Sequence, residues 1–362
     1  ATSYISAYEY CQEILVNKDI VLGSSEMWSF SSWGHGNRTN NSFLVLRGFN
    51  RVPGDLHIPG GGYYQSIADV KAGGADSDCW VSIDFSAVTS DYPIDPANSE
   101  NMIFTGFRIH GHLQYCLRAS SGSSFENNIF RHNVFEGEVN IANNVNSATV
   151  IDNYIKGSGI IFQCYNDEFV RLLGNIIEST DNFAVNAPGS NMAAFGNLVI
   201  GGSGKSAFLI QKHNYVFAAG NTLIGGTDNG VIAFGGSVTL PGEVVSLNNI
   251  LLPSVQSCPA YHQASHSDYN YGSLYADNDC VYVEGVGKVT VLAENSLSGQ
   301  PAFTDDQIIE QDPQLDNKYL PRKKSILLGG VVSVTGKTTI GAAVQEHQFA
   351  GRSSNSNRGR LG

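Results

Sequence analysis

The chain has 362 residues, with 40 glycines, 15% charged side chains and a formal net charge of −12 at pH 7. This acidic balance argues against a nucleic-acid-binding protein, which presents a basic surface. No run approaches the roughly 18 apolar residues of a membrane-spanning helix, and the six cysteines lack a Cys/His metal spacing. The composition favours a turn-rich, all-β protein.

Residues 6–17 predict a short amphipathic helix at the start of the chain. Ser6 and Glu9 have the spacing of a capping box, and apolar residues follow on one face. We expect this helix to cover the open first coil of the fold, because an exposed sheet end invites association. Residues 1–42 are therefore predicted to form an N-terminal cap and loop.

The first strand is predicted at residues 43–49, where apolar and β-branched residues dominate. A Gly- and Pro-rich excursion follows at residues 50–80, and a second strand at residues 81–85. Strand patterns then recur regularly from residue 102 onward. Residues 43–252 are therefore predicted to form the body of the domain.

One short phrase recurs through this body, beginning with asparagine and continuing as a mostly apolar strand. Its copies begin at Asn133, Asn153, Asn175, Asn197, Asn221 and Asn249. Consecutive copies are 20 to 28 residues apart. A period of this length is typical of a solenoid, in which each repeat is one coil and cannot bury its apolar face alone.

Each coil is predicted to contain three short strands and no helix. In one coil these are residues 159–163, 169–173 and the asparagine phrase from residue 175, separated by Gly, Asn and Asp turns. Three strands per coil describe a parallel β-helix. A leucine-rich repeat would need a fixed leucine spacing, which is missing.

The recurring asparagine has a structural explanation. Asparagine tolerates the left-handed backbone conformation at a bend, and its amide can satisfy backbone groups in adjacent coils. We therefore predict a stacked internal amide ladder and assign it no catalytic role. The predicted rungs are Asn153, Asn175, Asn197, Asn221 and Asn249.

The end of the chain carries a more specific pattern: Ser267-Asp-Tyr-Asn270, Asp312-Pro-Gln-Leu315, Ser325-Ile-Leu-Leu-Gly329 and Ile340-Gly-Ala-Ala-Val-Gln345. Together with the repeats, it resembles right-handed parallel β-helix proteins of the pectate-lyase-like kind. The closing segment is similar to that of secreted bacterial and phage-encoded β-helices, although Ile326 stands where their motif has proline. The resemblance implies an all-β, right-handed parallel β-helix, with irregular C-terminal coils at residues 253–346 and a basic tail at residues 347–362.

Alternation along the strands predicts two outward columns. One holds Ile161, Ala184, Leu209 and Ile232, and the next holds Gln163, Asn186 and Gln211. An apolar stripe beside an amide column suggests a subunit interface, and we predict a homotrimer. A glycan-binding groove and a loop packed over the stripe are the alternatives that the sequence leaves open.

Enzymes with this fold act on acidic polysaccharides, and lyases among them pair a base with Lys or Arg and often calcium. Candidate catalytic residues are Asp167, Glu168, Arg171 and His213, on turns that stack two coils apart. A solvated turn explains the same residues, and lone histidines such as His110 and His112 are usually structural. We predict no cofactor, and calcium enters only with the lyase alternative.

The function predicted from these patterns is that of a bacteriophage virion protein, in capsid decoration or associated with the tail. Expected partners are further copies of the chain, other virion proteins and cell-surface polysaccharide. Ala1 fits a trimmed initiator methionine, and Arg352, Arg358 and Arg360 suit an acidic particle surface. The alternative is a secreted bacterial lyase or glycosidase, whose signal was removed earlier.

Overall fold

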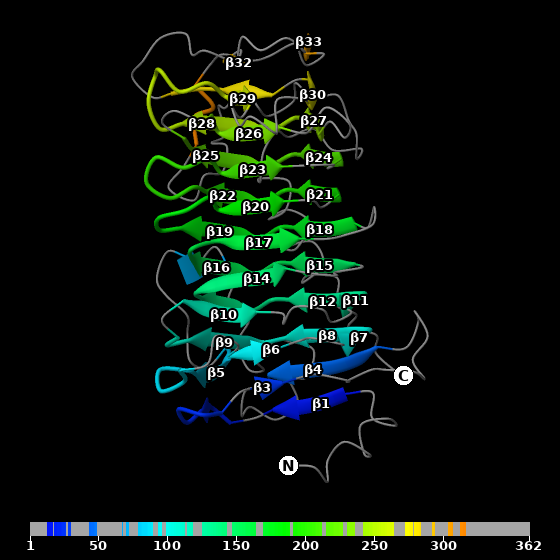
Figure 1. The fold of residues 1–362 in the computed structure, drawn as a ribbon, viewed down its shortest axis with the longest axis vertical. Coiled ribbons are helices and arrows are strands. Elements are labelled where there is room, and N and C mark those ends of the chain that lie inside the picture. Colours follow the sequence, from blue (N-terminus) through cyan, green and yellow to red (C-terminus); the bar gives the residue numbers. More distant parts are fainter. Residues whose placement is uncertain are drawn as a thin grey trace, which may run out of the picture.

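The computed structural model describes residues 13–16, 18–26, 28–29, 43–48, 67, 70–71, 79–89, 93–95, 99–112, 114–118, 125–142, 147–163, 169–188, 191–211, 215–226, 230–235, 242–263, 272–277, 279–283, 292–293, 303–306 and 312–315. These residues form a stack of parallel coils, in which each coil adds one strand to each of three sheets (Figure 1). The predicted parallel β-helix is confirmed. The described residues contain no helix long and apolar enough to cross a membrane.

The three sheets contain 11, 10 and 8 strands among the described residues. Sheet 1 comprises β1 (Glu13–Val16), β4 (Leu44–Gly48), β8 (Met102–Thr105), β12 (Asn128–Arg131), β15 (Ala148–Ile151), β18 (Phe169–Leu173), β21 (Asn191–Phe195), β24 (Tyr215–Ala219), β27 (Gly242–Leu247), β30 (Gly272–Asp277) and β33 (Phe303–Asp306). Sheet 2 comprises β2 (Ile20–Val21), β5 (Val81–Asp84), β9 (Phe107–His110), β13 (Val134–Glu136), β16 (Tyr154–Gly157), β19 (Ile176–Ser179), β22 (Leu198–Ile200), β25 (Thr222–Gly225), β28 (Ile250–Pro253) and β31 (Cys280–Val281).

Sheet 3 comprises β10 (Tyr115–Arg118), β14 (Glu138–Ala142), β17 (Ile160–Gln163), β20 (Val185–Pro188), β23 (Phe208–Gln211), β26 (Ile232–Gly235), β29 (Tyr261–Gln263) and β32 (Leu292–Ala293). Two further pairs are β3 (Trp28–Ser29) with β6 (Ile94–Asp95) and β7 (Ser99–Glu100) with β11 (Phe125–Glu126).

The start of the chain differs from its prediction. Glu13–Val16 is strand β1, paired in parallel with β4, so the helix expected at residues 6–17 is wrong over this part. The strand alternates exposed and half-buried residues, and Ile14 and Val16 pack against the core. The remainder of the predicted helix lies outside the described residues.

The core fills the interior of the coils because alternate residues of every strand point inward. Sheet 2 shows this most simply, since one inward residue per strand stacks on the next. These residues are 0–1% exposed: Ile83, Ile109, Phe135, Ile155, Ile177, Val199, Leu223, Leu251 and Val281.

A two-residue turn joins sheet 1 to sheet 2 in successive coils, and its second residue is the recurring asparagine. The first residue of the turn has a positive φ, as at Asp152 (53°), Gly174 (66°), Gly196 (62°) and Asn248 (54°). The left-handed conformation therefore belongs to the residue before the ladder asparagine. The prediction that the ladder asparagine itself takes it was wrong.

The asparagine ladder is confirmed and is longer than the five predicted rungs. The Asn197 Oδ1 accepts hydrogen bonds from the backbone N (2.9 Å) and Nδ2 (3.0 Å) of Asn175. Its Nδ2 donates to the Leu172 carbonyl and to the Asn221 Oδ1, both at 2.9 Å. The same pattern repeats from Asn133 through Asn153 and onward to Asn249. All six asparagines are fully buried.

The outer side of sheet 2 is covered by other parts of the chain. Ile67, Val70 and Trp80, from the long connection between β4 and β5, form a second apolar cluster with its outward residues. Lys71 pairs with Glu178 on this side, and Leu315 packs near the C-terminal coils. The outer face of sheet 2 is therefore partly covered by other segments of the chain. The outer faces of sheets 1 and 3 remain as the candidate functional faces.

Candidate functional site

The register of sheet 3 corrects the predicted outward columns. Phe208 pairs with Ile232, and Leu209 pairs with Ala233. Ile232 therefore lies in the inward column with Phe208, and it is 0% exposed in the core. Ala184 is likewise 0% exposed. The prediction that Ile232 and Ala184 face outward was wrong, because turns of unequal length shift the alternation from coil to coil.

The actual outward column of sheet 3 combines the two predicted columns. Its successive positions are Arg118, Asn140, Ile161, Asn186, Leu209, Ala233 and His262. Asn186 thus aligns with Ile161 and Leu209, not with the two glutamines. The side chains of Ile161, Gln163 and Gln211 lie outside the described residues.

Sheet 3 does not present an open apolar stripe at Leu209. This side chain is 7% exposed, and its neighbour Ala233 is 1% exposed. An exposed stripe was the motive for expecting a subunit interface here. Because both residues are already buried within one copy of the chain, they do not supply that exposed stripe.

Three polar atoms in the same column have no hydrogen-bond partner among the described residues. They are the Oδ1 atoms of Asn140 and Asn186 and the Nδ1 of His262, and all three are buried. Burial also lowers the pKa of His262, which favours the neutral imidazole. The column therefore holds unsatisfied hydrogen-bonding capacity, which a native fold normally pairs with protein, water or ligand.

A polar cluster lies at the N-terminal end of this column. Glu138 is 5% exposed, and its Oε1 accepts a hydrogen bond from the Asn140 Nδ2 at 3.0 Å. The Arg118 guanidinium lies 4.6 Å from the centre of the Tyr115 ring. Burial raises the pKa of the Glu138 carboxyl, against the opposing effects of the Asn140 bond and the Arg118 charge. A raised pKa moves a carboxyl toward the range in which it can act as a general acid.

The sequence did not single out this cluster as a site. Glu138 lies directly after Gly137 in an asparagine repeat, and nothing in its local pattern marks the side chain as buried. The signal appears only when register places Tyr115 opposite Glu138 and Arg118 opposite Asn140. Cross-strand neighbours of this kind lie 20 or more residues apart in the chain.

Of the earlier catalytic candidates, Arg171 alone is among the described residues. Arg171 is exposed on the outer side of sheet 1, between Thr149 and Ala193 of the adjacent strands. Asp167, Glu168 and His213 lie outside the described residues. Arg171 is therefore on a different face from the Glu138 cluster.

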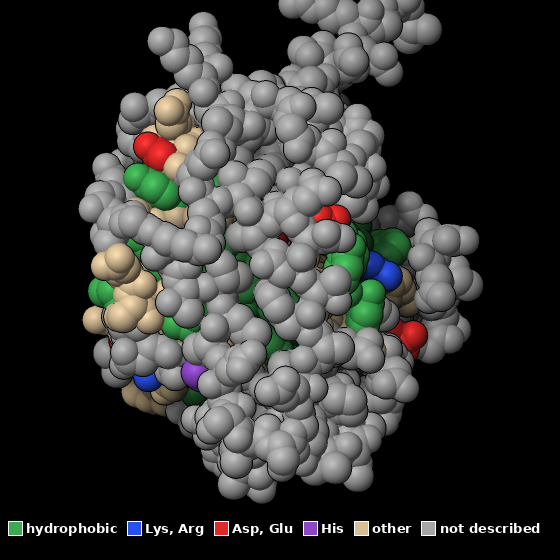
Figure 2. Space-filling model, turned by 90° about the horizontal axis from the view of Figure 1, so that it is seen from above, with side chains coloured by type: hydrophobic (Ala, Val, Ile, Leu, Met, Phe, Trp, Pro, Cys, Tyr) green, Lys and Arg blue, Asp and Glu red, His purple; other side chains and the backbone are tan. Residues whose placement is uncertain are grey.

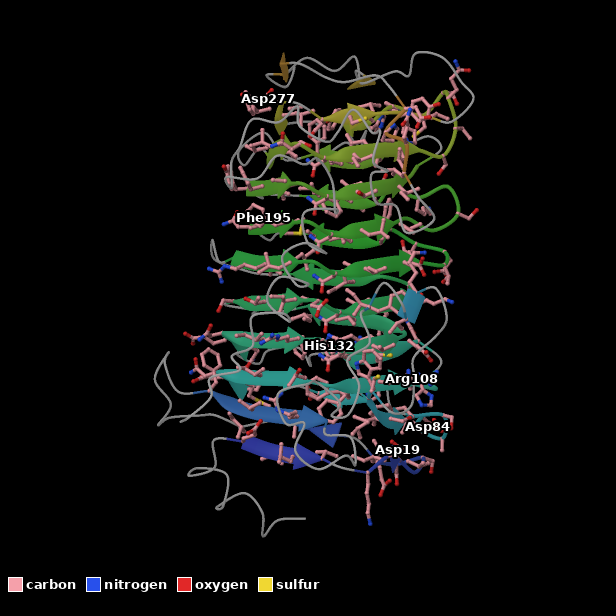
Figure 3. All side chains as sticks on the ribbon, turned by 180° about the vertical axis from the view of Figure 1, so that it is seen from behind. Asp19, Asp84, Arg108, His132, Phe195 and Asp277 are labelled. Atoms are coloured by element: carbon pink, nitrogen blue, oxygen red, sulfur yellow. The ribbon has the colours of Figure 1, made fainter. Side chains whose placement is uncertain are left out.

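His110 belongs to a charged column on the outer side of sheet 2. Its neighbours in register are Asp84 on one side and Glu136 on the other. The Ser82 Oγ lies 2.7 Å from the His110 Nε2, and the Arg108 Nη2 donates to the Glu136 Oε1 at 3.0 Å. Figure 3 shows Asp84 and Arg108 together near the N-terminal end. The Ser82–His110 hydrogen bond and the Arg108–Glu136 ion pair thus link successive coils, and we interpret the column as structural.

Sheet 1 carries the apolar face that sequence reasoning missed. Two of its outward columns are the Phe217 column and the Phe195 column, and their described residues are mostly half-buried. The Phe217 column is Val45, Ile103, Ile129, Thr149, Arg171, Ala193, Phe217, Val245 and Tyr275. The Phe195 column is Arg131, Ile151, Leu173, Phe195, Ala219, Leu247 and Asp277. The Phe195 and Phe217 rings lie 5.5 Å apart, and Tyr275 is 40% exposed.

Metal and disulfide chemistry find no support in the part of the chain that the structure describes. No group of three His, Cys, Asp or Glu side chains in it could hold a metal ion. Cys258 and Cys280 are both buried, and no disulfide joins them. Seen along the coil axis in Figure 2, the visible charged side chains are scattered and form no single-sign patch.

The architecture is established by strand register, since every pair between neighbouring coils is parallel. The resemblance to pectate-lyase-like and phage-encoded proteins rests on the closing motif. Comparison of the chain with protein-family models, with curated proteins and with solved structures gave no match.

Proposed function

We propose that this protein is a structural component of a bacteriophage virion that decorates the capsid or associates with the tail. It acts by assembly and by surface or glycan contact. The observation that carries the proposal is the outer face of sheet 1, where apolar side chains stay partly exposed over many consecutive coils. Extended apolar faces of this kind mark association.

Two further features support a scaffold role. The buried ladder links successive coils through side-chain amides from Asn133 to Asn249, which suits a rigid body that carries contacts. The closing motif, including Ile340-Gly-Ala-Ala-Val-Gln345, resembles that of phage-encoded β-helices and supports the virion setting.

The virion proposal is tested by where the protein is found. Mass spectrometry of purified particles should detect the chain at tens to hundreds of copies per particle. Deleting residues 346–362 should reduce its incorporation, because that segment carries the Arg352, Arg358 and Arg360 charges expected to contact an acidic particle. A truncated chain with unchanged circular dichroism is the folding control. Recovery only as free protein in a bacterial culture supernatant would refute the proposal.

A polysaccharide-degrading enzyme is the second candidate, favoured by the buried Glu138 beside Arg118, Tyr115 and Asn140. If it were correct, uronate-containing polysaccharides would yield unsaturated products or new reducing ends. Glu138→Gln would then abolish turnover, because the amide cannot donate the proton. Glu26→Gln, at an exposed carboxyl near the N-terminal end, is the matched control. We expect no turnover by the wild type; robust cleavage that is lost only in Glu138→Gln would reverse the ranking.

A further inference from the structure

The outer face of sheet 1 is large enough to hold a second protein surface. Eleven strands at a spacing of about 4.8 Å give a length of about 48 Å, and about five residues per strand give a width of about 16 Å. The product is about 800 Å², close to the area that each partner contributes to a standard protein interface. Figure 3 shows Phe195 and Asp277 along one side of the coil stack.

The charges on this face are distributed unevenly along the coil axis. Arg131 and Arg171 lie on β12 and β18, both exposed and without an ion-pair partner among the described residues. Asp277 lies half-buried on β30. The two arginines are thus toward the N-terminal end of the face, and Asp277 is toward its C-terminal end.

We propose that the sheet 1 face binds a second copy of this chain, with the two coil stacks antiparallel. The proposal rests on the assembly role given above and names the partner of that face. Two chains that each carry a net charge of −12 repel one another overall. A self-association therefore needs local charge complementarity, and only the antiparallel arrangement supplies it.

The strand order fixes which residues meet. A two-fold axis parallel to the strands and passing at β21 places Phe195 against Phe195 of the second copy. β18 and β24 are each one strand from β21, so Arg171 faces the Phe217 ring of the second copy. β12 and β30 are each three strands from β21, so Arg131 faces Asp277 of the second copy. Each polar contact occurs twice, as two-fold symmetry requires.

A parallel arrangement, including a trimer about an axis along the coils, gives the opposite electrostatics. Every coil then faces the same coil of its neighbour. Arg131 would lie near Arg131, and Asp277 near Asp277. Like charges placed together disfavour association, so the antiparallel dimer replaces the predicted homotrimer on this face.

The decisive experiment measures the oligomeric state of the full chain by sedimentation equilibrium, for the wild type and for variants in which interface charges are reversed. The wild type should be a dimer at micromolar concentration, and Phe195→Asp should weaken it by about 30-fold or more, the scale of an interface hot spot. Val21→Asp is the matched control, because Val21 is 73% exposed on sheet 2. Circular dichroism and the thermal midpoint confirm that each variant is folded.

Two charge-reversal substitutions, tested singly and together, show whether the two coil stacks are antiparallel or parallel. Arg131→Asp and Asp277→Arg should each weaken the dimer, and the double variant should restore it, because the antiparallel contact is re-formed with reversed signs. In a parallel assembly the single changes would have little effect and the double variant would gain nothing. A wild type that is monomeric or trimeric, a dimer insensitive to Phe195→Asp, or a folded double variant without rescue overturns the proposal. The virion proposal is judged separately, by detection in particles.

Discussion

Asp279 ends the asparagine ladder, and its chemistry explains why the last rung is an acid. Each asparagine rung donates through Nδ2 to the next coil, so a last asparagine would have a donor without a following rung. A carboxylate has no donor and accepts instead. The Asp279 Oδ1 accepts from the Asn249 backbone N at 2.6 Å, while its Oδ2 accepts from the hydroxyls of Ser246, at 2.5 Å, and Tyr261.

Burial makes this terminal carboxylate sensitive to pH. Asp279 is 0% exposed, and burial raises its pKa from 3.8 to about 6, despite the hydrogen bonds that lower it. A raised folded-state pKa contributes stability that is fully present below pH 3.8 and is lost as pH rises through 6. The difference corresponds to about 3 kcal/mol across that window.

Asparagine and aspartate exchanges should therefore have opposite pH dependences at the end and in the middle of the ladder. Asp279→Asn leaves a donor without a following rung at every pH but removes the ionisable group, so it should destabilise the fold by about 3 kcal/mol less at pH 7.5 than at pH 4. Asn197→Asp removes the donor to Leu172 and Asn221 and buries a charge, so it should destabilise by several kcal/mol at pH 7.5. Denaturant unfolding at both pH values measures this. Equal effects of the two exchanges, or an Asp279→Asn effect independent of pH, would contradict the argument.

At the scale of the strand, the sequence predicted the elements better than their register. The Asn133–Asn249 repeat and the alternation within strands are local patterns, so the coils and the ladder could be recognised directly. Register depends on turn length, which varies between coils, and this is why Ile232 was placed on the wrong side. A shift of one residue exchanges the inward and outward faces of a strand.

The candidate sites were harder to predict, for the same physical reason. Asp279 was missed because its rung reads Asn278-Asp279, although the following Cys280-Val281 matches the strand after Asn249. The Glu138 cluster depends on cross-strand neighbours and on burial, neither of which a single strand reveals. The sheet 1 face was overlooked because only one strand per coil was assigned an outward column, although Phe195 and Phe217 lie in strands with the same alternation.

The whole molecule is a one-dimensional stack of coils. The central coils should therefore be the most resistant to local opening, and the end coils the least. A terminal strand such as β1 or β33 has one strand neighbour among those described, whereas a central strand such as β21 has two. Opening an end coil therefore breaks one coil-to-coil interface, and opening a central coil breaks two. We expect amides in β18, β21 and β24 to exchange with solvent about 100-fold more slowly than those in β1 and β33.

Hydrogen exchange followed by mass spectrometry tests this, and the ladder supplies the internal check. In Asn197→Asp, exchange should accelerate first in the peptides that contain Asn175 and Asn221, because their side chains bond directly to residue 197. The N-terminal coils should keep their wild-type rates, since the interfaces between them are untouched. Uniform acceleration over all coils in Asn197→Asp would mean that the stack opens as a single unit. Equal protection of the end and central coils in the wild type would lead to the same conclusion. Graded protection with a local response to the mutation would show that each coil is held chiefly by its immediate neighbours.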